Sequence, residues 1–177
     1  PGGRGDGVPV SSLIELQNGA KPVAMLTGQP EQHYLLSGSG GYGFIAKLGD
    51  MVGRVKAGKV VMTVDSGETV LLPIAINPDC KIVLASSDHR LLAFSIGELK
   101  VMPKGRGLQL MSLTDGTSLE HTAVISSAEF TVETVGRRGA VHQERLRIRD
   151  IVGKRGKKGK VLEISGRLKR LSGVDSV

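Results

Sequence analysis

Tryptophan is absent from this chain, and only two tyrosines and three phenylalanines occur among its 177 residues. Proteins that bind single-stranded nucleic acid usually stack the bases on exposed aromatic rings. The few rings here lie in apolar, strand-like runs, which disfavours that mode of binding. No apolar run approaches the ~18 residues of a membrane-spanning helix, and nothing resembles a signal peptide. We therefore expect no contact with a membrane.

Cysteine and histidine are equally sparse. Cys80 is the single cysteine, so no internal disulfide can form, and a reducing compartment is the simplest inference. Its apolar neighbours predict that Cys80 is a small buried hydrophobe. The histidines at 33, 89, 121 and 142 are scattered without ligand spacing, so we expect no metal site.

Two motifs that suggest catalysis are better explained in other ways. Residues 53–59 match the first part of a phosphate-binding P-loop, but Val60 stands where Ser or Thr would bind magnesium. The Ser86-Ser87-Asp88-His89 cluster contains all three residue types of a Ser-His-Asp catalytic triad. It lies between two apolar runs, where a hairpin turn is expected. We assign no catalytic residue.

Positive charge is concentrated at the end of the chain. The net charge is +7. Residues 137–177 contain 13 lysines and arginines against four acids, whereas residues 1–136 contain 11 against 13. This asymmetry is typical of a polyanion-binding face or tail. A solvated basic surface that aids solubility explains the charge alone equally well.

A short glycine-and-basic box recurs about every fifty residues. The last glycines of the four copies are at positions 7, 58, 107 and 159, so the steps are 51, 49 and 52 residues. Each copy is followed by an apolar run, and a period of this size indicates an array of one supersecondary unit. The first, second, third and fourth boxes are residues 3–7, 54–58, 104–107 and 154–159.

The segments between the boxes predict strands and tight turns. Alternating apolar residues, β-branched residues and Gly, Asn, Asp or Ser turns indicate an all-β chain with about four strands per repeat. Residues 144–151 fit either a short helix or a strand. Repeats are expected near 1–57, 58–106, 107–158 and 159–177. The expected strands are 12–16, 23–27, 33–37, 42–47, 59–64, 69–76, 81–86, 90–95, 107–113, 119–125, 128–135 and 160–165.

These features resemble the C-terminal domain of the A subunit of bacterial DNA topoisomerase IV, and the related domain of the gyrase A subunit. The resemblance is most specific in residues 40–44, 54–59, 102–107 and 153–159. It implies a single β-pinwheel, a propeller-like array of four-stranded blades that exchange strands. It also implies a non-catalytic module that binds duplex DNA and positions or bends DNA segments for a catalytic core. That core, with its nucleophilic tyrosine, lies outside this chain.

The resemblance further implies partners and a location. The partners are duplex DNA, the core of the topoisomerase IV A subunit and the B subunit, with a chromosome-segregation protein as a further one. The location is the bacterial cytoplasm, in association with the nucleoid. No cofactor is expected in this domain, because ATP and magnesium belong to the rest of the ATP-dependent type II topoisomerase.

The chain departs from the family in two respects. All four boxes are degenerate, and only residues 154–159 approach the full form, so strong chiral wrapping of DNA is not expected. At about fifty residues per blade, the chain has room for roughly three and a half blades, fewer than a complete array. We interpret it as a fragment that begins inside a box and runs to the C-terminus.

Selected basic side chains in or beside the boxes, at the 136–139 turn and near the end of the sequence are the candidate DNA contacts. Lysine and arginine neutralise phosphates and release counterions, and glycine lets the backbone approach phosphates closely. Flexible loops read base edges poorly, so little sequence preference is expected. The candidates are Lys154, Arg155, Lys157, Lys158, Lys160, Arg137, Arg138, Lys104, Arg106, Arg54, Lys56, Lys59, Arg4, Arg167, Lys169 and Arg170.

Two other functional classes remain open at this point. A propeller-like adaptor that binds an acidic protein fits the same basic surface. A propeller enzyme fits less well, because no group of convergent polar residues is visible. Salt-dependent binding of DNA would favour the DNA-binding class, and a nuclease-resistant complex with a protein would favour the adaptor.

Overall fold

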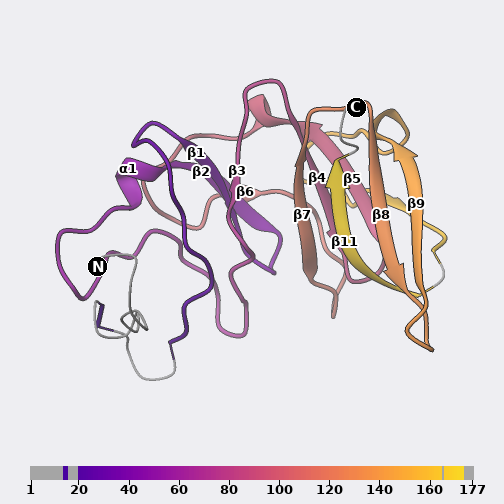
Figure 1. Cartoon of the computed structure of the whole chain (residues 1–177), viewed down its shortest axis with the longest axis horizontal. Coiled ribbons are helices and arrows are strands. Elements are labelled where there is room, and N and C mark those ends of the chain that lie inside the picture. The colour runs from indigo at the N-terminus through magenta and orange to yellow at the C-terminus, as the bar shows by residue number, and fades with distance from the viewer. Residues whose placement is uncertain (1–13, 16–19, 165, 174–177) are drawn as a thin grey trace, which may run out of the picture.

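Three antiparallel sheets form a curved row in this computed structural model, which describes residues 14–15, 20–164 and 166–173. Figure 1 shows the sheets following one another in chain order. No helix in these ranges is both long and apolar enough to cross a membrane. The all-β prediction is confirmed.

The first sheet is built around a hairpin with the strand order β3-β1-β2-β6. Its central strands pair in register from His33 with Lys47 to Ser37 with Gly43. The turn between them contains Gly40 and Gly41, as the sequence predicted. The strands are β1 (His33–Ser37), β2 (Tyr42–Lys47), β3 (Ile74–Ala75) and β6 (Leu108–Gln109).

The second sheet repeats this plan with the order β10-β5-β4-β7. Its hairpin pairs Lys81 with Ser95 and Ala85 with Leu91 at its two ends. The strands are β4 (Lys81–Ser86), β5 (Arg90–Ser95), β7 (Leu119–Ile125) and β10 (Lys160–Val161).

The third sheet has three strands in the order β11-β8-β9. In the described part of the chain, the outer edge of β9 has no partner strand. The strands are β8 (Glu129–Val135), β9 (Val141–Arg147) and β11 (Arg167–Gly173).

Neighbouring sheets exchange strands in the same way twice. β6 follows the third box and pairs with β2 of the preceding sheet. β10 follows the fourth box and pairs with β5 of the sheet before it. Parallel bridges join Ile45 of β2 to Val101 and Ala93 of β5 to Val152. The link before each of these two boxes therefore contacts the same strand that pairs with the segment after the box. This exchange is the defining feature of a β-pinwheel.

Short helical turns follow each hairpin, where the sequence predicted an irregular link. They are α1 (Leu48–Met51), η2 (Ile96–Glu98) and η3 (Ile148–Asp150). Residues 144–151, left open between helix and strand, form the end of β9 and then η3.

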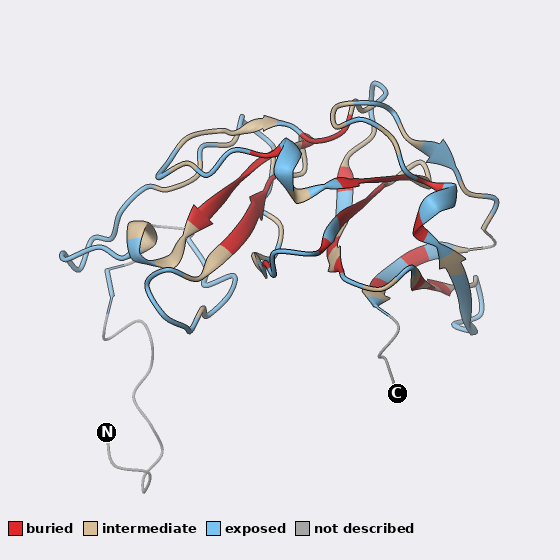
Figure 2. Cartoon of the chain, turned by 90° about the horizontal axis from the view of Figure 1, so that it is seen from above, coloured by how far each residue is buried: buried red, intermediate tan, exposed pale blue. Residues whose placement is uncertain are grey.

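The hydrophobic core lies between the sheets, with β4 at its centre. Ile82 and Leu84 pack toward the first sheet, and Val83 and Ala85 pack toward the third. All four are fully buried, which explains why β4 is a continuous apolar run without alternation. Burial of each large side chain contributes about 1.5–3 kcal/mol. Figure 2 shows this buried centre, with exposed loops around it. Cys80 is also buried, as expected.

Several strand predictions were wrong in extent. Residues 23–27 and 59–64 form no strand, and residues 69–76, 107–113 and 160–165 contain only the two-residue strands β3, β6 and β10. Positive backbone φ angles at Gly58, Gly107 and Gly159 turn the chain beside these segments and keep the ladders short. Residues 167–173, for which the sequence analysis predicted no strand, form β11. Of the expected strand 12–16, residues 12, 13 and 16 lie outside the described residues.

Candidate nucleic-acid interface

Main-chain hydrogen bonds join successive boxes into one track. The amide of Thr63 donates to the carbonyl of Gly105 at 3.0 Å, and the amide of Ser112 donates to the carbonyl of Lys157 at 3.1 Å. The amide of Glu15 donates in the same way to Lys56 at 3.2 Å. In each case, the segment that follows one box is hydrogen-bonded to the next box along the chain. The second, third and fourth boxes therefore lie side by side in chain order.

Gly107 in the third box and Gly159 in the fourth allow their boxes to pack closely against the neighbouring hairpins. A Cβ on Gly107 would overlap the carbonyl oxygen of Gly43, and a Cβ on Gly159 would overlap that of Leu91. Both glycines have positive φ, at +89° and +76°. Since Gly43 and Leu91 lie near the hairpin turns, the boxes are fixed at the turn ends of the hairpins.

The fourth box and Lys160, the residue directly after it, present a group of exposed lysines. Lys154, Lys157, Lys158 and Lys160 are all exposed. None of their ammonium groups makes a hydrogen bond or ion pair with a described residue. These four charges, here called the lysine cluster, are available to an external anion.

Arg155 differs from its lysine neighbours, because its donors are engaged within the protein. Its amide donates to the Glu98 carboxylate at 3.0 Å, and its Nε donates to the Glu98 carbonyl at 3.1 Å. Its Nη1 donates to the Gln109 carbonyl at 2.5 Å. Arg155 thereby connects the fourth box to η2 and to β6.

Arg106 in the third box is also engaged internally. It forms ion pairs with Asp65 at 2.8 Å and with Glu68 at 3.4 Å. Its guanidinium carbon lies 4.1 Å from the centroid of the Tyr42 ring, a cation–π contact. Lys104 in the same box is exposed and has no partner among the described residues.

The second box is exposed throughout. The side chains of Arg54 and Lys56 have no hydrogen-bond or ion-pair partner in the described ranges, whereas the Lys59 ammonium donates to the carbonyl of Asp50 at 2.6 Å. Arg4 of the first box lies outside the described residues.

Arg137 and Arg138 occupy the turn between β8 and β9 and are exposed. This is the turn end of the third hairpin, equivalent to the ends where the third and fourth boxes contact the other two hairpins. The two arginines therefore extend the same edge of the array.

The basic residues of β11 face a different environment. Lys169 pairs with Glu133 at 3.0 Å. Hydrogen bonds from Gln143 and then Lys169 lower the pKa of Glu133. Arg167 and Arg170 are exposed. They belong to β11, which pairs with β8 and which the sequence analysis did not predict as a strand.

Three further arginines were not among the candidate DNA contacts predicted from the sequence, although they alternate with apolar residues in β9 and η3. Arg145 pairs with Glu129 at 3.8 Å, and Asp150 pairs with Arg147 at 3.1 Å and with Arg149 at 3.8 Å. The alternation predicts exposed side chains, but the pairing acids could not be inferred from it.

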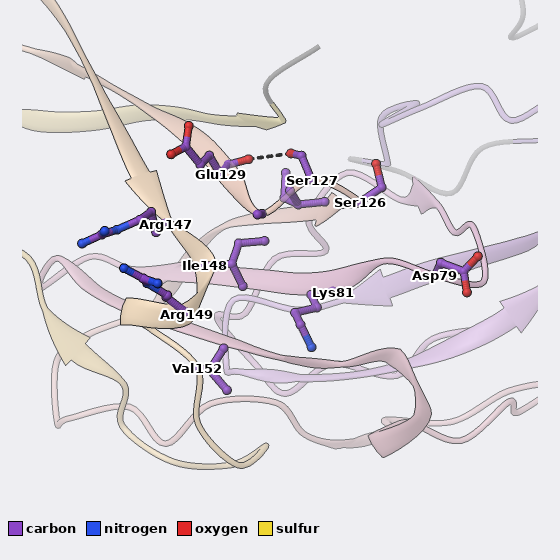
Figure 3. A pocket seen from close by; sticks show the side chains of 11 residues that line it. Asp79, Lys81, Ser126, Ser127, Glu129, Arg147, Ile148, Arg149 and Val152 are labelled. Atoms are coloured by element: carbon purple, nitrogen blue, oxygen red, sulfur yellow. Dashed lines mark hydrogen bonds between the residues drawn. The ribbon is translucent and has the colours of Figure 1, made fainter. Parts of the chain in front are cut away.

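Arg147 and Arg149 line a pocket of about 550 Å³ between the second and third sheets (Figure 3). Ile125 and Ile148 contribute apolar surface, and Lys81 adds a third cation. Asp79 and Glu129 line the same pocket, and Asp150 pairs with both arginines. The charges therefore balance, and the pocket lacks the excess positive charge of the lysine cluster.

The Ser86–His89 segment forms a turn, as the sequence predicted. The Asp88 carboxylate accepts a hydrogen bond from the Ser86 hydroxyl and pairs with Arg90 at 3.0 Å. The hydrogen bond from Ser86 is the main cause of the lowered pKa of Asp88. His89 has a φ of 60°, and its amide closes the turn onto the Ser86 carbonyl.

Comparisons with known proteins place these observations in a wider context. The chain is 71% identical over 178 residues to the A subunit of DNA topoisomerase 4 from Neisseria gonorrhoeae, covering 97% of this chain and 23% of that protein. It is 26% identical over 183 residues to the Escherichia coli K12 protein of the same name, covering 99% of this chain and 24% of that protein. The chain thus spans about a quarter of the length of these relatives. No family model matches it.

Solved structures show the same fold. The C-terminal domain of E. coli ParC superposes with a TM-score of 0.86 at 24% identity, covering 96% of this chain and 71% of that one. The C-terminal domain of DNA gyrase A superposes with a TM-score of 0.70 at 20% identity, covering 94% and 58%.

Proposed function

This chain belongs with the C-terminal domains of the topoisomerase IV A subunit, and from that premise we propose that it is a duplex-DNA-binding module. It binds along the turn ends of the sheets, with little sequence preference. The lysine cluster of the fourth box is the observation that carries the proposal. It combines four exposed ammonium groups without internal partners among the described residues on a backbone closely fixed to the second sheet.

The physical basis is counterion release. Each phosphate that a lysine neutralises frees condensed cations from the duplex, so a row of such lysines gives affinity that depends strongly on salt. The main-chain track places Lys56, Lys104 and Lys157 on successive boxes. A row of cations on a curved array suits a duplex that bends along it.

The burial of the aromatic side chains supports duplex over single-stranded DNA. Phe44, Phe94 and Phe130 are fully buried, and Tyr34 is 6% exposed. Tyr42 is covered on one side by Arg106. Few rings therefore remain for stacking on unpaired bases.

In the larger protein, the module positions or bends DNA segments for the catalytic core of the A subunit, which acts with the B subunit in an ATP-dependent type II topoisomerase. The catalytic tyrosine lies outside this chain, and ATP and magnesium act elsewhere in the holoenzyme. This role places the protein on the bacterial nucleoid during chromosome segregation, where a segregation protein is a further partner.

Fluorescence anisotropy with labelled oligonucleotides tests the proposal. Two unrelated duplexes of equal length should bind with dissociation constants that agree within about threefold, and the matching single strands should bind more weakly. A clear preference for single strands, or for one duplex sequence, would contradict the duplex module. Absence of DNA binding, with a nuclease-resistant complex with an acidic protein, would favour the adaptor.

A further inference from the structure

The two types of basic residue in the fourth box are placed differently. The ammonium groups of the lysine cluster are exposed and make no hydrogen bond or ion pair with a described residue, whereas the Arg155 side chain is half-buried and gives two donors to main-chain carbonyls. Sequence alone groups all five residues together. Their contacts in the structure separate Arg155 from the four lysines.

We propose that Arg155 is a positioning residue that fixes the fourth box, while the lysine cluster supplies the phosphate contacts. This inference rests on the proposed DNA-binding function. It assigns to Arg155 a role that its charge alone does not predict.

The first argument comes from the donors of the guanidinium group. An arginine usually recognises phosphate through two parallel N–H groups of its planar fork. In Arg155, Nε is used by the Glu98 carbonyl and Nη1 by the Gln109 carbonyl. The edge of the fork that contains Nε is therefore occupied, and a phosphate there would have to displace a protein carbonyl.

The second argument comes from what the contacts join. Glu98 ends η2 of the second sheet, and Gln109 belongs to β6, which is paired into the first sheet. Arg155 thus connects the fourth box to two sheets at once. The next residue, Gly156, donates its amide to the Leu110 carbonyl at 2.8 Å, and Ser112 donates to Lys157 at 3.1 Å. These bonds continue the same attachment into the lysine cluster.

The third argument concerns Glu98. Its carboxylate accepts from the Arg155 amide, so an acidic group lies at the base of the box. A carboxylate disfavours a phosphate at that point, but it is well suited to hold a loop. A lysine at position 155 would keep the positive charge and lose the two-carbonyl geometry, because an ammonium lacks a planar fork.

The test compares two arginine-to-lysine substitutions, one inside the fourth box and one outside it, in the 177-residue chain. R155K should weaken binding to a labelled duplex at least about threefold at fixed salt, because the lysine cluster is held less firmly. R149K, the matched control at an exposed arginine outside the candidate contacts, should bind as the unaltered chain does. If R155K binds normally while R155Q weakens binding as much as K157A does, Arg155 is an ordinary phosphate contact and the proposal is wrong.

Hydrogen exchange provides a readout that does not require DNA. The amides of Gly156 and Ser112 should exchange about tenfold faster in R155K and remain unchanged in K157A. E98Q weakens the same attachment from the other side and should accelerate the Gly156 amide to a smaller extent. Unchanged exchange in both R155K and E98Q would overturn the positioning role. If neither the unaltered chain nor any variant binds DNA, but the Gly156 and Ser112 amides exchange faster in R155K, the DNA-binding function fails and the positioning role stands.

Discussion

Gly159 lies against the carbonyl oxygen of Leu91 so closely that a side chain at position 159 would overlap it. Gly107 has the same relationship to Gly43, one sheet earlier. In the third and fourth boxes, the last glycine is therefore a packing requirement as well as a conformational one. It brings the basic loop down onto the turn end of each hairpin.

Gly159→Ala should lower the free energy of unfolding by ~3 kcal/mol or more, because backbone strain at positive φ adds to the overlap with Leu91. Gly58→Ala is the matched control, since Gly58 has a φ of +78° and no atom lies within 4 Å of the position that a Cβ would take. The control should lose only the ~1–2 kcal/mol of backbone strain. Urea denaturation measures the free energy of unfolding of both variants. Equal losses would show that the close approach of Gly159 to the Leu91 carbonyl contributes nothing.

Arg106→Ala should destabilise the fold by about 1–2 kcal/mol, because its ion pairs with Asp65 and Glu68 and its Tyr42 contact are lost together. The side chain is 38% exposed, so solvent partly screens the ion pairs and keeps the loss small. Lys104→Ala in the same box should change stability by less than about 0.5 kcal/mol. Thermal melts of the two variants that coincide would contradict a structural role for Arg106.

Protonation of His121 should lower the free energy of unfolding as the pH falls. Burial is the main cause of its lowered pKa, and the ring contacts the Leu168 carbonyl at 3.2 Å, with Glu120 and Arg167 nearby. The folded state thus favours the neutral ring. This contribution is complete above the ordinary pKa of about 6.5 and is lost as the pH falls through the lowered value.

Urea denaturation between about pH 7.5 and 5 spans the ordinary histidine pKa and tests this expectation. His121→Asn should remove part of the pH dependence of the free energy of unfolding. The same pH dependence in the His121 variant and in the unaltered chain would rule out this residue as the cause.

Removing three of the four lysines of the lysine cluster should weaken DNA binding more than removing Lys59 and the basic side chains of the second box. The triple variant K154A/K157A/K158A should bind duplex DNA about 10–100-fold more weakly at moderate salt. The variant R54A/K56A/K59A should lose less, because Asp50 already engages Lys59 and because residues 1–136 carry no net positive charge. Equal losses, with circular dichroism unchanged, would mean that the concentration of charge near the C-terminus is irrelevant.

The hairpins could be predicted from the sequence because their signals are local. β1–β2 and β4–β5 are apolar runs separated by glycine, serine and aspartate turns, and the structure confirms their bounds. The strands β3, β6 and β10 are only two residues long, and pairing across repeats defines them. β11 was missed because Arg167, Lys169 and Arg170 conceal the two buried residues Leu168 and Leu171.

The candidate interface was predictable in composition but not in geometry. The box glycines and lysines are visible in the sequence with a period of about fifty residues. The partners of Arg155 and Arg106 are not, because Glu98 is 57 residues from Arg155 and Glu68 is 38 residues from Arg106. Only the fold brings these pairs together, so sequence reasoning could not separate the internally bound arginines from the free lysines.

The salt dependence of duplex binding tests the central claim most directly. If about five basic side chains contact phosphates, the logarithm of the association constant should fall with the logarithm of salt concentration at a slope of about −4 to −5, from ~0.9 per contact. K154A/K157A/K158A should reduce the steepness by about 2.7, in proportion to its three lost contacts. A slope near zero for the unaltered chain, or an unchanged slope in the triple variant, would contradict the account.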